Sequence, residues 1–141
     1  MWVKWEYQGN LPTETKMAKI LLIEDEGPVR EMLMDELSDL GHTVIEAVNG
    51  EDGLRKFLEV EPDLVLCDRA MPGLSGYELL ERIRGAHPQF GDIPFVFLTA
   101  LTDPRDKAAV EHLHPDAYIE KPLDFAVLSQ KIEHLIHRSA H

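Results

Sequence analysis

The sequence has few of the features that mark several common classes of protein. It contains a single cysteine, Cys67, which excludes a disulfide framework and a thiolate metal cluster. No apolar stretch approaches the roughly 20 residues of a membrane-spanning helix, and the N-terminus lacks the continuous apolar segment of a signal peptide. Basic side chains are scarce, because 14 Lys and Arg stand against 26 Asp and Glu, for a net charge of -12. We therefore expect a cytoplasmic protein that makes no contact with a membrane and no direct contact with nucleic acid.

The length of 141 residues suits one domain with an adequate core. Residues 1–17 are mostly polar and aperiodic, with Gly9, Asn10 and Pro12 as structure breakers. We interpret them as an extension outside the fold; a short arm that packs on the domain is the alternative. The predicted domain covers residues 18–138, and residues 139–141 form a tail.

Short apolar runs alternate five times with segments of helical periodicity. The predicted strands are Lys19–Ile23, Thr43–Ala47, Asp63–Cys67, Ile93–Leu98 and Ala117–Glu120. The predicted helices begin at Pro28, after Asn49, after Ser75, at Asp103 and near Phe125. Two of them carry helix-start signals, Asn49 with Asp52 and Ser75 with Glu78, each in the manner of a capping box. Such alternation of buried strands and helices predicts an α/β fold with a parallel sheet covered on both faces.

Polar side chains stand where the predicted strands end. The first strand runs into Glu24 and Asp25, the third into Asp68, the fourth into Thr99 and the fifth into Lys121. The carboxyl ends of parallel strands share one edge of the sheet, which is where open α/β sheets bind their ligands. Carboxylates crowded at one edge repel each other unless a cation is bound. A hard divalent ion with oxygen ligands, such as Mg²⁺, fits that requirement.

Four motifs together resemble those of a response regulator receiver domain of two-component signalling. They are LLIEDE, DLVLCDRAMPGLSG, PFVFLTA and YIEKP, in the family's order, and the resemblance covers Ala18 to Arg138. It implies a flavodoxin-like, doubly wound, five-stranded parallel sheet in the order 2-1-3-4-5 with five helices. The resemblance also implies a signalling module that is not a dedicated enzyme and that assists only its own phosphorylation and dephosphorylation. A stand-alone receiver and a receiver from a larger protein are both open.

The resemblance implies a role for each polar residue of the strand ends. Asp68 is the expected phosphoacceptor, taking a phosphoryl group from a sensor histidine kinase or a phosphotransfer protein. Asp25 and Asp68 are expected to bind Mg²⁺, or Mn²⁺ in its place, together with Glu24 through water and the backbone carbonyl of Ala70. Thr99 is expected to donate its hydroxyl to the phosphoryl group.

Lys121 is expected to bring a positive charge to the same group, and the family has a cis bond between Lys121 and Pro122. Tyr118 matches the switch aromatic that turns inward when Thr99 moves toward the phosphate. That movement is expected to repack the face of helix 4, strand 5 and helix 5 for a downstream protein target. A half-buried strand aromatic is the alternative for Tyr118, and a phosphorylation-dependent homodimer is one further option.

The chain departs from the family pattern at three positions. Glu24 stands where Asp is more common, and we expect its longer side chain still to act through water. Ala70 and Leu101 are apolar where many members carry amide or acidic groups beside the path of the hydrolytic water. We therefore hypothesise that an acyl phosphate on Asp68 is shielded and is lost slowly.

Other functions fit the sequence less well. An aspartate-based phosphatase needs a second acid two residues after the nucleophile, where Ala70 stands. A nucleotide or flavin site would have a Gly-rich or hydroxyl-rich loop after the first strand, where an acidic run would repel phosphate. The histidine pairs His112/His114 and His134/His137 lack converging ligands and suit a solvated surface. A degenerate receiver that acts as a phosphorylation-independent interaction module is the remaining alternative.

Overall fold

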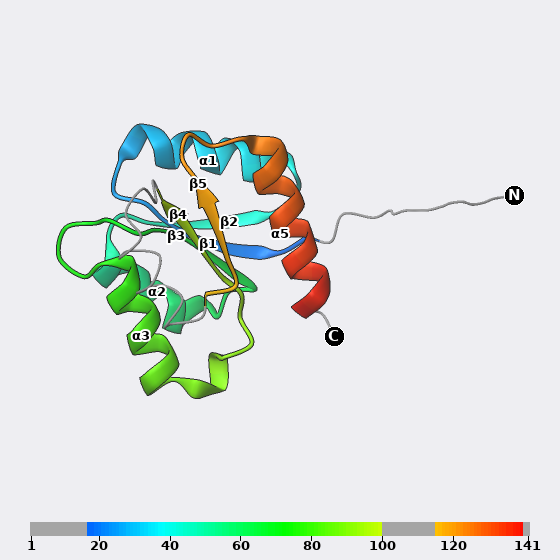
Figure 1. The fold of residues 1–141 in the computed structure, drawn as a ribbon. Coiled ribbons are helices and arrows are strands. Elements are labelled where there is room, and N and C mark those ends of the chain that lie inside the picture. The colour runs from blue at the N-terminus through cyan, green and yellow to red at the C-terminus, as the bar shows by residue number, and fades with distance from the viewer. Residues whose placement is uncertain (1–16, 100–114, 140–141) are drawn as a thin grey trace, which may run out of the picture.

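Five parallel strands form one sheet in the order β2-β1-β3-β4-β5 in the computed structural model, which describes residues 17–99 and 115–139 (Figure 1). The strands are β1 (Lys19–Ile23), β2 (Thr43–Ala47), β3 (Leu64–Asp68), β4 (Phe95–Thr99) and β5 (Ala117–Glu120). The helices are α1 (Gly27–Asp39), α2 (Gly50–Val60), α3 (Gly76–Ala86), the short 3-10 helix η1 (Pro88–Phe90) and α5 (Phe125–Ser139). The predicted fold class and strand order are confirmed. The helix predicted at residues 103–113 and residues 1–16 of the predicted extension (1–17) lie outside the described residues. Met17, the last residue of that extension, is 71% exposed.

Helices cover both faces of the sheet (Figure 1). Successive side chains of a strand point to opposite faces, so each buried strand contributes to two apolar cores. Ile20, Leu66 and Leu98 lie in the core that α1 and α5 cover. Leu21 and Phe97 lie in the core under α2 and α3. This two-sided burial explains why β3 and β4 are apolar at consecutive positions instead of at alternate ones.

The two predicted capping boxes have different outcomes. Ser75 and Glu78 form the reciprocal pair as expected, each side chain accepting from the other residue's backbone N–H. At α2, Asn49 accepts from the N–H of Asp52 at 2.8 Å, but the Asp52 carboxylate does not return the bond. It accepts instead from the N–H of Val48 at 3.1 Å and pairs with Lys56 at 3.3 Å. The second capping box is therefore only half formed, because the Asp52 carboxylate bonds to Val48 and Lys56 and not to the N–H of Asn49.

Some strand limits differ from those predicted. β3 includes Asp68, and β4 begins at Phe95 and includes Thr99, whereas its predicted run was Ile93–Leu98. The carbonyl of Pro94 accepts from the N–H of Val65, but the proline itself has no N–H to offer a ladder. The shift places Asp68 and Thr99 within the strands and not after them.

The start of α3 lies in close contact with the end of β3. A Cβ on Gly76, the first residue of α3, would lie 2.7 Å from the carbonyl oxygen of Asp68 and 2.8 Å from the ring of Phe97. The N–H of Gly76 also donates to the carbonyl of Arg69 at 3.1 Å. Glycine at this position therefore fixes the course of the loop between β3 and α3, which borders the site described next.

Candidate functional site

The polar residues predicted at the strand ends lie together at the carboxyl edge of the sheet. Asp68 ends β3, Thr99 ends β4, and the N–H of Lys121 donates to the carbonyl of Thr99 at 2.9 Å. These residues share a pocket of about 250 Å³ with residues from the loops after β1 and β3. It is lined by Asp25, Glu26, Asp68, Arg69, Ala70, Thr99 and Lys121.

Three carboxylates converge beside this pocket. One oxygen atom from each of Glu24, Asp25 and Asp68 can be chosen so that all three lie within 4.8 Å of one another. Glu24 is fully buried, and Asp68 is 6% exposed. Burial and the neighbouring charge of Asp68 raise the pKa of Glu24 to about 7, against lowering effects from the Glu26 N–H and Lys121. Burial and the charge of Asp68 therefore disfavour the charged form of Glu24.

Lys121 partly offsets this repulsion. Its Nζ lies 3.5 Å from Oδ1 of Asp68 and 3.7 Å from Oε1 of Glu24. The Lys121 side chain is 27% exposed, so it lies at the rim of the pocket and not within the core. The peptide bond between Lys121 and Pro122 is cis, as the family resemblance implied.

The remaining site residues have distinct environments. Thr99 is 2% exposed, and its Oγ1 has no hydrogen-bond partner among the residues that the structure describes. Ala70 is exposed and lines the pocket. Tyr118 is partly buried on β5, opposite Phe97 of β4, and packs against the core under α2 and α3. Leu101 lies outside the described residues.

The residues present fit a divalent cation. The three carboxylates offer the oxygen ligands that Mg²⁺ and Mn²⁺ prefer, and the pocket leaves room for water at further ligand positions. A cation there would oppose the charge repulsion that raises the pKa of Glu24. Among the described residues, this is the one group of three or more acidic, histidine or cysteine side chains that could hold a metal.

Two pocket residues were not predicted to belong to the site. The N–H of Glu26 donates to Oε2 of Glu24 at 3.2 Å and so holds that carboxylate in place. Arg69 follows Asp68 directly, and its guanidinium carbon lies 5.9 Å from the centre of the Tyr77 ring. Arg69 could have been predicted from the sequence as a pocket residue, because it directly follows Asp68. The contact of Glu26 could not, because it depends on how the chain turns after β1.

The histidines and the cysteine lie in different environments. His134 and His137 are exposed on α5, as expected of a solvated surface, while His112 and His114 lie outside the described residues. Cys67 is fully buried, and burial raises the pKa of its thiol well above the usual value. His42, for which we made no prediction from the sequence, has a completely buried side chain.

A family model for the response regulator receiver domain matches residues 20–133 of the chain. Among curated proteins, the chain is similar to the transcriptional regulatory protein AfsQ1 of Streptomyces coelicolor, with 36% identity over 122 residues. This match covers 86% of the chain and 52% of AfsQ1. The chain spans about half the length of the curated relatives it matches.

Solved structures give the same result. A response regulator receiver domain protein from Clostridium thermocellum matches with a TM-score of 0.80 and 30% identity, covering 88% of this chain and 98% of that one. The chemotaxis response regulator CheY4 of Vibrio cholerae matches with a TM-score of 0.78 and 27% identity, covering 85% of this chain and 99% of CheY4. The matched family model, the sheet order and the acids beside Lys121 agree, and the chain belongs to the response regulator receiver domains.

Proposed function

We propose that this receiver domain accepts a phosphoryl group on Asp68 from a histidine of a sensor kinase or phosphotransfer protein. An oxygen of Asp68 attacks the phosphorus, the bond from phosphorus to the histidine nitrogen breaks, and the released imidazole takes up a proton from solvent. The product is an acyl phosphate on Asp68. The observation that carries this proposal is the 3.5 Å separation between Lys121 Nζ and Oδ1 of Asp68, beside two further carboxylates.

In the proposed site, Glu24, Asp25, Asp68 and the backbone carbonyl of Ala70 hold Mg²⁺, or Mn²⁺ in its place. When bound, the cation supplies positive charge that offsets the negative charge of the phosphoryl oxygens. Asp68 positions its oxygen for attack from the end of a rigid strand. Glu24, which is fully buried, acts through water and not as the nucleophile.

Lys121 and Thr99 are proposed to bind the incoming phosphoryl group. The Lys121 ammonium is at the pocket rim, so it can contact a phosphoryl group that enters the pocket. The buried hydroxyl of Thr99 has no partner among the described residues, so it is free to donate to a phosphoryl oxygen. This supports the role proposed for Thr99.

Tyr118 is the proposed switch residue. Its ring lies against the core beside Phe97, and the backbone carbonyl of Tyr118 accepts from Nζ of Lys131 on α5 at 3.1 Å. Movement of Thr99 toward a phosphate would open space for the ring to turn inward. The surface of β5 and α5 would then change and bind a downstream protein target, or a second phosphorylated copy.

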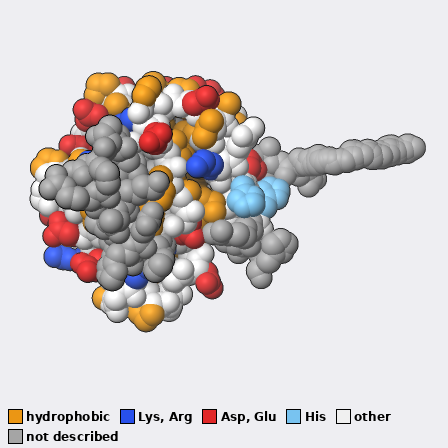
Figure 2. All heavy atoms as spheres, in the orientation of Figure 1, with side chains coloured by type: hydrophobic (Ala, Val, Ile, Leu, Met, Phe, Trp, Pro, Cys, Tyr) orange, Lys and Arg blue, Asp and Glu red, His pale blue; other side chains and the backbone are white. Residues whose placement is uncertain are grey.

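The charge of the molecule supports a protein partner and not nucleic acid. On the face drawn in Figure 2, basic side chains lie apart from one another among many acidic ones. Among the described residues that are visible on this side, the side chains form no basic patch for a phosphate backbone. We propose a cytoplasmic protein; among the described residues, no helix is both long enough and apolar enough to span a membrane.

The test is incubation with Mg²⁺ and a small phosphoramidate donor, followed by measurement of the intact mass. The wild type is expected to gain one phosphate, and the gain should disappear in Asp68→Ala and when the metal is chelated. Asp35→Asn, which removes an exposed carboxylate of α1, is the matched control and should gain the phosphate normally. An equal gain in Asp68→Ala would contradict the assignment. No gain in any variant would favour a phosphorylation-independent interaction module.

A further inference from the structure

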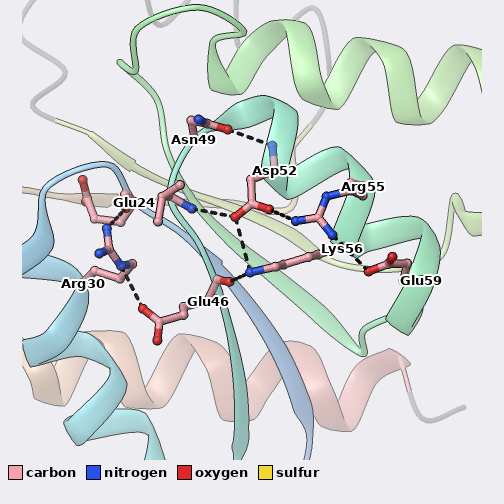
Figure 3. Close-up of polar contacts among 9 residues, drawn as sticks. Glu24, Arg30, Glu46, Asn49, Asp52, Arg55, Lys56 and Glu59 are labelled. Carbon is pink, nitrogen blue, oxygen red and sulfur yellow. Dashed lines mark hydrogen bonds and ion pairs between the residues drawn. The ribbon is translucent and has the colours of Figure 1, made fainter.

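Arg30 connects three elements beside the acidic residues. It lies in the first turns of α1, and its side chain is 17% exposed. Nη1 donates to the backbone carbonyl of Glu24 at 2.8 Å, and Nε donates to Oε1 of Glu46 on β2 at 2.9 Å. Figure 3 shows the guanidinium between these two partners. One planar group therefore ties the start of α1 to the end of β1 and to β2.

The contact with Arg30 completes a set of bonds around Glu24. The N–H of Glu24 donates to the carbonyl of Ala47 at 3.1 Å, so the backbone is held on its amide side as well. Oε2 of the Glu24 side chain accepts from the N–H of Glu26 at 3.2 Å. Asp25, which belongs to the group of three acids, lies between these bonds. Hydrogen bonds therefore hold the residues before and after Asp25, which are Glu24 and Glu26.

The Glu46 end of this contact is itself anchored. Nζ of Lys56 on α2 donates to the backbone carbonyl of Glu46 at 2.6 Å and pairs with Asp52 at 3.3 Å. The Asp52 carboxylate also accepts from the N–H of Val48, just after β2. Figure 3 shows Lys56 between Glu46 and Asp52. The Glu46 carboxylate, which binds Arg30, thus lies at the end of β2, and Lys56 of α2 holds the backbone there.

Helix stability does not account for this arrangement. A cation in the first turns of a helix opposes the helix dipole, so the position of Arg30 is not one that favours α1 by itself. The Glu46 carboxylate is 44% exposed, and an ion pair with a solvated partner contributes little to stability by itself. The bond that distinguishes Arg30 is its charge-assisted contact with the carbonyl of Glu24.

We propose that Arg30, held by Glu46, is a positioning residue that orients Glu24 and Asp25 for cation binding. The inference rests on the proposed function, because it assigns Arg30 to the metal site proposed there. Arg30 touches no reacting atom and acts through the backbone of Glu24. Partners that orient metal ligands in this way commonly change metal affinity by about 10- to 100-fold when removed.

The test measures Mg²⁺ binding by calorimetry without a phosphoryl donor, and amide hydrogen exchange of the metal-free protein. Arg30→Ala is expected to weaken Mg²⁺ binding roughly tenfold and to reduce the exchange protection of the Glu26 amide. Arg30→Lys should recover part of the loss, since an ammonium can still donate to the Glu24 carbonyl. Arg82→Ala is the matched control, because Arg82 is exposed on α3 and its charge acts on Glu78, outside the contacts of Arg30.

A second variant keeps the test decisive if Arg30→Ala folds poorly. Glu46→Ala leaves the guanidinium without its carboxylate and should weaken Mg²⁺ binding in the same direction, without further loss in the double variant. Mg²⁺ affinity equal to that of the wild type in folded Arg30 and Glu46 variants would overturn the inference. Absence of Mg²⁺ binding by the wild type would instead contradict the proposed function. In that case amide exchange of the metal-free protein would still test Arg30. Equal protection of the Glu26 amide in the wild type and in Arg30→Ala would overturn the positioning role.

Discussion

The ammonium nitrogen of Lys121 lies 3.5 Å from Oδ1 of Asp68, although 53 residues separate the two in the sequence. The sheet causes this proximity, because parallel strands end on one edge and β4 alone lies between β3 and β5. Glu24 comes to the same point from β1, on the other side of β3. The Lys121 ammonium therefore lies near two carboxylates, one directly after β1 and one at the end of β3.

Replacing Lys121 should slow phosphorylation more than it affects folding. Lys121→Gln removes the charge next to Asp68, and we expect phosphorylation by a small phosphoramidate to slow by roughly 100-fold, as for loss of one donor to a developing anion. Intact-mass time courses at saturating Mg²⁺ would measure the rate. The matched control is Lys19→Gln, which removes an exposed lysine at the opposite end of β1. Equal rates for the two variants would contradict the role of Lys121.

His42 should make stability depend on pH. Its Nδ1 accepts from the N–H of Ala18 at 3.1 Å, and its Nε2 lies 3.5 Å from Oε1 of Glu133 on α5. Burial lowers the pKa of His42 below its ordinary value, against the opposing effect of Glu133. The folded state therefore binds fewer protons than the unfolded state. The stability from neutral His42 is present above the unfolded pKa of about 6.5 and is lost as the pH falls through the lower folded pKa.

Urea unfolding between about pH 8 and about pH 5 would measure this effect. The stability advantage of the wild type over His42→Gln should shrink as the pH falls. His137 also pairs with Glu133, at 3.4 Å, so His137→Gln is the control that separates the loss of this contact from the effect of His42. A wild-type advantage that stays constant across this range would contradict the prediction.

Two glycine substitutions should have opposite effects on stability. A Cβ on Gly50, at the start of α2, would lie 2.2 Å from the carbonyl oxygen of Leu74. Gly50→Ala should therefore destabilise the protein by about 1–3 kcal/mol, as overpacking does. Gly85 in α3 has open space around it, and Gly85→Ala should stabilise the protein by about 0.5–1 kcal/mol. Denaturant titrations of both variants would check these signs, and a stabilising Gly50→Ala would contradict the packing described here.

An amide at position 70 should shorten the life of the proposed acyl phosphate. Ala70 is exposed at the pocket, and an apolar side chain there cannot orient a water molecule toward the phosphorus. Ala70→Asn is expected to speed phosphate loss, which is timed by intact mass after the donor is removed. Ala70→Val, which changes size without adding a polar group, is the control. Loss at the wild-type rate in Ala70→Asn would count against the shielding hypothesis.

The two predicted capping boxes show where prediction from the sequence succeeds and where it fails. Ser75 and Glu78 are three residues apart in one helix turn, so their capping box follows from local geometry and was predicted correctly. Asn49 and Asp52 have the same spacing, but Asp52 also meets Lys56 and the amide of Val48. Competition from neighbours that the fold supplies turned its carboxylate away from the predicted partner.

The sequence alone was sufficient for the fold class, the strand order through its family resemblance, and the group formed by Glu24, Asp25, Asp68, Thr99 and Lys121. Buried strands must be apolar and a parallel sheet has one carboxyl edge, so a polar residue ending each apolar run already marks that edge. Only the tertiary structure decided the burial of His42 under α5 and the contact between Arg30 and the carbonyl of Glu24. These depend on distances between elements that no periodicity encodes, because side chains meet across packed layers whose spacing the whole core sets.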